Sequence, residues 1–189
     1  MANDDISMGG SLVSGTNPLP TTSESGKATY SVQVSAVTPA ALATDILSLV
    51  GSATKTVRIN RVQITADATA AAVLDFYVFK RTVADTGGTA TQPAICKLDS
   101  ADPAPTAVAN LYSANPVVGA GVLLASDHYA LPAAGTPTYP ATLWVADFGT
   151  RNDKQIVLRG VGESLGVGCN GGTIPAGTSV HARIEFTEE

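Results

Sequence analysis

The chain has 189 residues, of which 14% are charged, and its formal net charge is −5 at pH 7. The acidic balance argues against a nucleic-acid partner, because binding phosphates requires a basic face. No apolar run is long enough for a membrane helix, and no apolar leader follows the N-terminus, so we expect neither a membrane partner nor classical secretion. A chain of this length can bury a core without a disulfide or a structural metal.

The charged fraction lies well below the ~25% that is usual for soluble domains. Because charge keeps free proteins apart in solution, so weakly charged a surface is typical of a protein that other subunits largely cover. Lysine and glutamate, which are good helix formers, are scarce, whereas alanine, threonine, valine and glycine are abundant. The composition therefore predicts strands and not long helices.

Residues 1–27 form the first segment, rich in Gly, Ser, Thr, Asn and Pro. Its few apolar residues cannot bury enough surface to offset the entropy of ordering it. We interpret this segment as an extended N-terminal interaction arm that lies against a neighbouring molecule or, alternatively, packs back on its own domain.

Residues 28–36 alternate apolar and polar side chains, which predicts a half-buried strand. Residues 43–50 fit either a helical turn or a short strand. Residues 54–82 carry the longest strand patterns, and the apolar phase slips by one residue near Asn60, which indicates a β-bulge or a bend. Residues 73–81 are apolar on both faces and predict a central strand buried on two sides.

Residues 83–105 predict a long loop excursion with one short strand. Further strand-like segments are 107–112, 119–124, 141–148 with Trp144 as a large core candidate, 155–159, 164–170 and 178–187. In the last, Val180, Ala182, Ile184 and Phe186 share one face. Short strands with frequent turn signals predict an all-β fold, a jelly-roll-like β-sandwich over residues 28–189.

Two motifs contain catalytic residue types. Asp85-Thr86-Gly87 is the triplet of aspartic proteases, but it lies in a polar loop and has no second copy, so we interpret it as a turn. Ser126-Asp127-His128 holds the three residue types of a hydrolase triad side by side. Neighbours on a strand point to opposite faces, which argues against catalysis, and His181 is expected on an outer strand face. We therefore predict no catalytic residues and no enzyme activity.

Other residues have side chains that could act as ligands. Asp99, Asp102, Asp147 and Asp153 could supply oxygens to calcium, but they lack a regular spacing and are interpreted as turn or capping residues. No helix follows Gly119-Ala120-Gly121 or Gly160-Val161-Gly162, so neither predicts a phosphate site. Cys96 and Cys169 are expected as buried, inert thiols in preference to a disulfide. We predict no metal and no cofactor.

Four blocks resemble a family of small structural proteins encoded among the virion genes of tailed bacteriophages. They are Asp45–Ile59 (DILSLVGSATKTVRI), Lys80–Thr89 (KRTVADTGGT), Asp147–Asn152 (DFGTRN) and Phe186–Glu189 (FTEE). The resemblance implies a jelly-roll-like virion component on the capsid surface that decorates or cements the shell, often as a homotrimer, with the major capsid protein as partner. Binding only the assembled shell would stabilise that state by mass action.

Two alternatives remain open. One is a component of the phage tail or fibre base, which the resemblance does not separate from a head protein. The other is a carbohydrate- or receptor-binding β-sandwich module. Sugar sites usually present exposed aromatic platforms, for which the sequence offers Tyr112, Tyr129 and Tyr139 in loop-like stretches.

Overall fold

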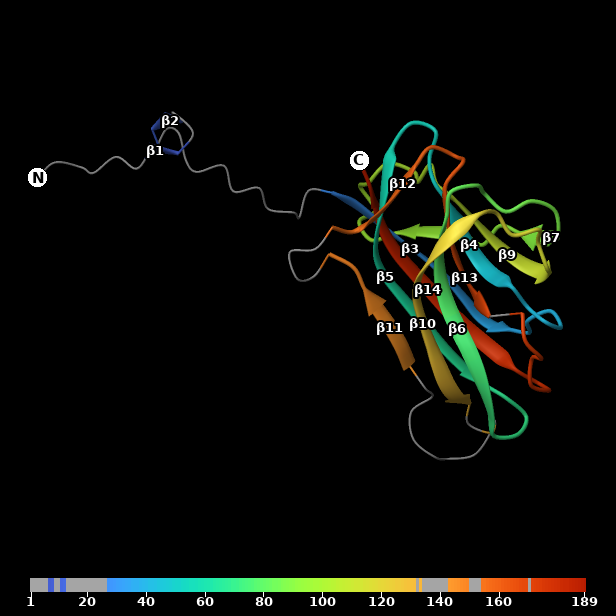
Figure 1. The fold of residues 1–189 in the computed structure, drawn as a ribbon. Coiled ribbons are helices and arrows are strands. Elements are labelled where there is room, and N and C mark those ends of the chain that lie inside the picture. Colours follow the sequence, from blue (N-terminus) through green and yellow to red (C-terminus); the bar gives the residue numbers. More distant parts are fainter. Residues whose placement is uncertain are drawn as a thin grey trace, which may run out of the picture.

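The computed structural model describes residues 27–131, 133, 143–149, 154–169 and 171–189, together with residues 7–8 and 11–12 (Figure 1). Within these residues the chain is all-β and has no helix, and therefore none that could cross a membrane. Strands β1 (Ser7–Met8) and β2 (Ser11–Leu12) pair with each other. Most of the predicted arm, residues 1–27, lies outside the described residues, so its role as an interaction arm stays a prediction.

The other strands form two six-stranded antiparallel sheets packed as a sandwich, which confirms the predicted class. Sheet I has the order β10 (Gly121–Leu131), β6 (Ala72–Arg81), β13 (Ser164–Cys169), β4 (Asp45–Val50), β9 (Val108–Ala114), β7 (Thr89–Thr91). Sheet II has the order β11 (Leu143–Asp147), β5 (Thr56–Asp67), β14 (Ser179–Glu188), β3 (Ala28–Val37), β8 (Ile95–Lys97), with β12 (Ile156–Arg159) also paired to β5. The jelly-roll topology stays a prediction.

The core lies between the two sheets and follows the alternation along the strands. Every second residue of β14, from Val180 to Phe186, is buried, as the sequence predicts. The Phe186 ring stacks on Tyr30 of β3, with their centroids 5.4 Å apart. Trp144 is also buried, and its ring lies 6.4 Å from that of Tyr129, so this contact joins β11 of sheet II to β10 of sheet I. Burying each large side chain contributes roughly 1.5–3 kcal/mol.

The predicted irregularity near Asn60 is a β-bulge. Glu185 of β14 is opposite Arg61, but the next residue, Phe186, is opposite Ile59, so Asn60 is the extra residue of β5. The bulge shifts the buried phase of β5 by one residue, and Ile59 and Val62 both face the core. It also divides the other edge of β5, where β11 pairs with residues 61–65 and β12 with residues 56–59.

Three sequence-based predictions need correction or refinement. Segment 43–50, which fits either a helical turn or a strand, contains a strand, β4. Its apolar residues lie on both faces, and its backbone pairs with two neighbouring strands, β13 and β9. The excursion 83–105 holds two short strands, β7 and β8, which add to the ends of the two sheets. Strand β6 is buried on both faces only in its middle, at Phe76–Val78. Val73, near its first residue, is 51% exposed, because nothing among the described residues covers the outer face at the start of the strand.

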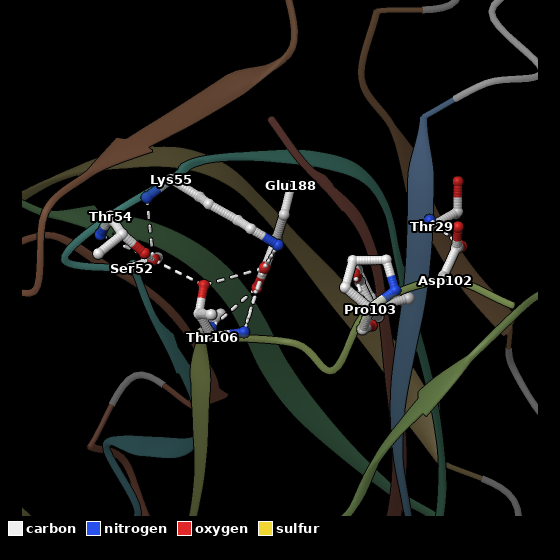
Figure 2. Close-up of polar contacts among 10 residues, drawn as sticks. Thr29, Ser52, Thr54, Lys55, Asp102, Pro103, Thr106 and Glu188 are labelled. Atoms are coloured by element: carbon white, nitrogen blue, oxygen red, sulfur yellow. Dashed lines mark hydrogen bonds and ion pairs between the residues drawn. The ribbon is translucent and has the colours of Figure 1, made fainter. Parts of the chain in front are cut away.

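Glu188 fastens the segment that crosses from β8 in sheet II to β9 in sheet I. Its buried carboxylate accepts hydrogen bonds from the backbone N–H groups of Thr106 and Ala107 and from the Thr106 hydroxyl, at 2.8–3.1 Å. The same carboxylate pairs with Lys55 at 3.2 Å (Figure 2). Nearby, Asp102 accepts the N–H of Thr29. One end of the sandwich is therefore closed by polar contacts.

Candidate functional site

Two loops lie hydrogen-bonded to each other against the outer face of sheet I, and we call them the paired loops (residues 82–88 and 115–120). Thr86 and Val117 exchange backbone hydrogen bonds of 3.1 and 2.7 Å, and the Thr82 N–H donates to the carbonyl of Ala120 at 2.7 Å. A side chain on Gly119 would meet the Val83 carbonyl at 1.7 Å, so the loops approach too closely for any other residue. The paired loops therefore form an additional layer over part of the outer face of sheet I.

A buried polar cluster joins the paired loops to sheet I. The Arg81 guanidinium donates to both carboxylate oxygens of Asp45, at 2.6 and 3.1 Å, and to the Gly119 carbonyl at 3.3 Å. Tyr77 donates its hydroxyl to Asp45 at 2.8 Å. Asp85 accepts the Gly119 N–H at 2.9 Å and lies 3.9 Å from the guanidinium. One cation therefore faces two buried carboxylates.

The pKa values of this cluster reflect its burial. Burial raises the pKa of Asp85 to about 6, and the charge of Asp45 adds to this, against the lowering effects of the Gly119 N–H and Arg81. The second oxygen of Asp85, Oδ2, is buried without a hydrogen-bond partner. Burial also raises the pKa of Tyr77, so its phenol remains protonated and can donate to Asp45. The cluster therefore holds the paired loops against sheet I, and burial disfavours the charged form of one of its carboxylates, Asp85.

Exposed aliphatic side chains gather on the paired loops and on the start of β10. Val117 is 71% exposed and Val122 is 62% exposed. The other members of this set, which we call the aliphatic surface, are Val83, Val118, Leu123 and Leu124. Scattered apolar residues are normal on a protein surface, but a group on adjoining segments is a candidate site of contact with another molecule.

Strand β10 adds a long open edge beside the aliphatic surface. It ends sheet I, and no described strand pairs with its outer side along residues 121–129. The other sheet edges end in strands of three to five residues, β7, β8, β11 and β12, whereas β10 has 11. Proteins usually shorten edge strands to avoid unwanted pairing, so a long edge with apolar side chains indicates a docking edge.

A groove of about 430 Å³ lies between the side chains of β6 and β10. Its lining residues are Asp75, Phe76, Tyr77, Phe79, Leu123, Ser126, Asp127 and His128. His128 Nδ1 is hydrogen-bonded to the Asp75 carboxylate, and both side chains are at least half exposed. Leu123 belongs both to the groove and to the aliphatic surface, so the two features adjoin at this residue.

The structure separates the three residue types of Ser126-Asp127-His128. His128 takes its carboxylate partner from Asp75 of β6, because these residues are opposite each other in the two strands. Asp127 instead accepts the His128 backbone N–H at 2.8 Å and the Tyr129 hydroxyl at 3.2 Å. Asp127 is therefore not the carboxylate partner of the His128 ring, and the three adjacent residues do not form a triad with one another.

The other candidate residues occupy structural positions. Gly87 adopts the left-handed conformation, with φ of 65°, which confirms the predicted turn at Asp85-Thr86-Gly87. The burial of Asp85 in a polar cluster was not predicted. His181 lies half-buried on sheet II, and its Nδ1 accepts the Ala36 N–H at 3.3 Å. Neither group of glycines precedes a helix in the described residues.

The candidate calcium ligands are dispersed. Asp99 accepts the Ala101 N–H in a turn at 2.8 Å, Asp102 holds Thr29, and Asp147 pairs with Arg61 at 2.6 Å. Asp153 lies outside the described residues. Within the described parts of the chain, no three His, Cys, Asp or Glu side chains come together as a metal site.

The prediction for the two cysteines is right for one and wrong for the other. Cys169 is buried in the core, and burial raises the pKa of its thiol to about 12, so the thiol stays protonated and unreactive. Cys96 is exposed because β8 is the last strand of sheet II, where its side chain points away from the core. Both thiols are free.

The predicted aromatic platforms also need correction. Tyr112 is buried in β9 and contacts Ser48, with the two hydroxyls 3.3 Å apart. Tyr129 lies in β10 and packs against the core. Tyr112 ends the strand-like segment 107–112, which the structure extends to Ala114, and Tyr129 lies beyond the segment 119–124, which the structure extends to Leu131. Tyr139 lies outside the described residues.

Sequence reasoning missed the aliphatic surface, the groove and the Asp45–Arg81 pair. A usable signal was present for the first, because Val117-Val118 and Val122-Leu123-Leu124 lie close together near Pro and Gly residues. The groove has no such signal, since Asp75 and His128 are far apart in the chain. No protein-family model, no curated protein and no solved structure matches this chain.

Proposed function

We propose that this chain is a non-enzymatic structural protein of a tailed-bacteriophage virion, which decorates and stabilises the head by binding the assembled shell. The observation that carries the proposal is the aliphatic surface beside the open edge of β10. Apolar side chains next to free backbone donors and acceptors suit adhesion to another protein chain. The sequence resemblance to virion proteins supports the choice of partner, the major capsid protein.

Binding to the assembled shell alone would stabilise it by mass action. The binding free energy of each contact stabilises the assembled shell, because unassembled capsid protein does not present a complete binding site. Association of the chain as a homo-oligomer, with a trimer favoured, would bring several contacts to the shell at once and increase the avidity. The low charge density agrees with a surface that neighbours cover.

Co-sedimentation with purified phage heads tests the proposal. The full chain should sediment with expanded shells that lack it and should delay their disruption by heat. Val117→Asp and Val122→Asp should each weaken this binding, whereas Leu98→Asp, an equally non-conservative change at a residue that is 55% exposed near β8, should not. A chain that sediments with tails and not with heads would instead place it in the tail or fibre base.

The N-terminal segment has its own test. Deletion should stop before Lys27, because the Lys27 ammonium pairs with Glu189 at 2.8 Å. A chain without residues 1–26 should keep its free energy of unfolding but lose its attachment to shells. If this shortened chain binds shells as the full chain does, the segment is not an interaction arm. The variants of the aliphatic surface test that surface independently.

A further inference from the structure

We propose that the paired loops are a proton-controlled latch, which lies closed on sheet I while the Asp85 carboxyl group carries a proton and opens once that group is ionised. Asp85 belongs to the first loop and lies in the buried cluster, where its side chain is 1% exposed. The Asp45 side chain is fully buried, and Arg81 is the one cation that faces both carboxylates. The latch would regulate the aliphatic surface, and its consequence for phage shells rests on the proposed function.

Hydrogen bonding distinguishes the two carboxylates of the cluster. Asp45 accepts two hydrogen bonds from the Arg81 guanidinium and one from the Tyr77 hydroxyl. Asp85 accepts the Gly119 N–H at 2.9 Å, and its Oδ2 is buried without a hydrogen-bond partner among the described residues. An ionised carboxylate has about four acceptor sites, and burying it with most of them unfilled is costly. The geometry therefore identifies Asp85 as the carboxylate that closed loops accommodate poorly when it is charged.

Four other charged or titratable groups surround Asp85. They are Asp45 on β4, Arg81 and Tyr77 on β6, and Tyr112 on β9. Burial raises the pKa of both tyrosines, so their phenols stay protonated, and the guanidinium stays charged. Within the described residues, β13 and the second loop add no titratable side chain on this face. Burial raises the pKa of Asp85 to about 6, so its charge changes near neutral pH.

The paired loops are fastened differently at their two ends. Near β9, the Asn115 side chain donates to the carbonyls of residues 41–42 and accepts the Thr44 N–H, at 3.2–3.3 Å. None of these groups titrates. Near β10, the Gly119 carbonyl accepts a hydrogen bond from the buried guanidinium, and its N–H donates to the Asp85 carboxylate. Ionisation of Asp85 therefore loosens the Gly119 end and leaves the Asn115 end in place.

The aliphatic surface is divided between the loops and the sheet. Val83, Val117 and Val118 lie on the loops, whereas residues 122–124 lie on β10. Closed loops keep the two groups adjacent, and open loops separate them. The closed form is favoured below pH 4 and loses this advantage as the pH rises through 6, by up to about 100-fold. A partner that covers the whole aliphatic surface should therefore bind more tightly at acidic pH.

Amide hydrogen exchange of the full chain tests the latch. After correction for the intrinsic exchange rate, the Gly119 N–H should lose protection by about tenfold or more between pH 5 and pH 8. Ile184, which is buried in the middle of sheet II, should keep its protection over this range. Asp85→Asn keeps an acceptor for Gly119 but cannot ionise, so its Gly119 protection should not change with pH. The carboxyl carbon of Asp85 should titrate near pH 6 in the wild type.

A matched variant controls for the removal of a carboxylate. Asp99 also accepts one backbone N–H, that of Ala101 at 2.8 Å, but it is exposed. Asp99→Asn should therefore leave the Gly119 profile as in the wild type. Constant Gly119 protection in the wild type, or the same fall in Asp85→Asn, would overturn the inference. An equal fall at Ile184 would also contradict it, because the whole domain would then be opening.

Shell binding separates the latch from the proposed function. Wild-type affinity for phage heads should fall by about tenfold between pH 5.5 and pH 7.5, and that of Asp85→Asn should fall less, which corrects for any pH dependence of the shell. Identical profiles for the two proteins would refute control of the aliphatic surface by Asp85. If the chain sediments with heads but Gly119 protection stays constant, only the latch fails. If Gly119 protection follows the pH but the chain sediments with no phage particle, the latch stands and the proposed function fails.

Discussion

Arg81 and Asp45 form a bidentate pair although their strands, β6 and β4, are not neighbours in sheet I. Strand β13 lies between them, and Gly166 is at the point where the two side chains meet above it. A side chain at Gly166 would come within 2.1 Å of Asp45 Oδ2. The missing side chain of one glycine therefore allows an ion pair to span three strands.

Gly166→Ala should destabilise the protein. The new methyl group would displace the Asp45 carboxylate from Arg81 or force the strands apart, at a cost of about 1–3 kcal/mol in the free energy of unfolding measured with urea. Gly162→Ala is the matched control, since nothing lies within 4 Å of the position of its new methyl group. Similar stability of both variants would show that Asp45 does not need the space above Gly166.

Arg81→Met should lower the free energy of unfolding more than Gly166→Ala does. Methionine keeps much of the apolar stem but leaves Asp45 and Asp85 buried without their cation, which should cost about 3–5 kcal/mol. Lys80→Met changes the neighbouring residue, whose partly exposed pair with Glu163 should contribute less than about 1 kcal/mol. Urea denaturation at pH 7 checks both, and a cost for Arg81→Met no larger than that for Lys80→Met would contradict the central role of this cation.

Asp85→Asn should show that ionisation of Asp85 destabilises the folded protein as the pH rises. The pKa of Asp85 is raised in the folded state, from about 3.8 to about 6, so its contribution to stability is fully present below pH 4 and is lost as the pH rises towards 6 and above. Asparagine keeps an acceptor for the Gly119 N–H but carries no charge. The variant should therefore gain stability relative to the wild type as the pH rises from 4 to 7, by up to about 3 kcal/mol.

The relevant quantity is the difference in unfolding free energy between Asp85→Asn and the wild type. The absolute stability of either protein also depends on other carboxylates, which titrate in the opposite sense. The pKa of Glu189, for example, is lowered by its bonds to Lys27 and Arg58, so its contribution is lost as the pH falls. Unfolding free energies at half-unit steps from pH 4 to 8 give the required curve. A constant difference across this range would show that Asp85 is ionised throughout.

Glu188→Gln should loosen the segment that leads from β8 to β9. The charged carboxylate accepts three donors from Thr106 and Ala107 and pairs with Lys55, and a neutral amide would weaken these bonds by about 1.5–3 kcal/mol in total. Amide hydrogen exchange should increase in residues 98–107. Glu189→Gln, at the next and more exposed carboxylate, should change stability by less than about 1 kcal/mol and leave that segment protected.

The fold class could be predicted because it depends on local alternation. Ile184 and Phe186 repeat at a period of two, and such a pattern buries one face of a strand whatever its neighbours are. The bulge at Asn60 was predictable for the same reason, since a shift in the apolar phase is visible along a single strand. Predictions failed at segment ends and edges, as for Cys96, whose exposure depends on β8 being the last strand of its sheet.

The sequence by itself determined that the chain is all-β, where its principal strands lie and that its surface carries little charge, because these properties depend on residues close together in the chain. Only the tertiary structure decided which strands end the sheets, that Asp75 meets His128 beside Phe79, and that Arg81 reaches Asp45 over Gly166. Each of these contacts joins residues that are distant in sequence, and sheet pairing, which is set by the burial of the whole core, brings them together.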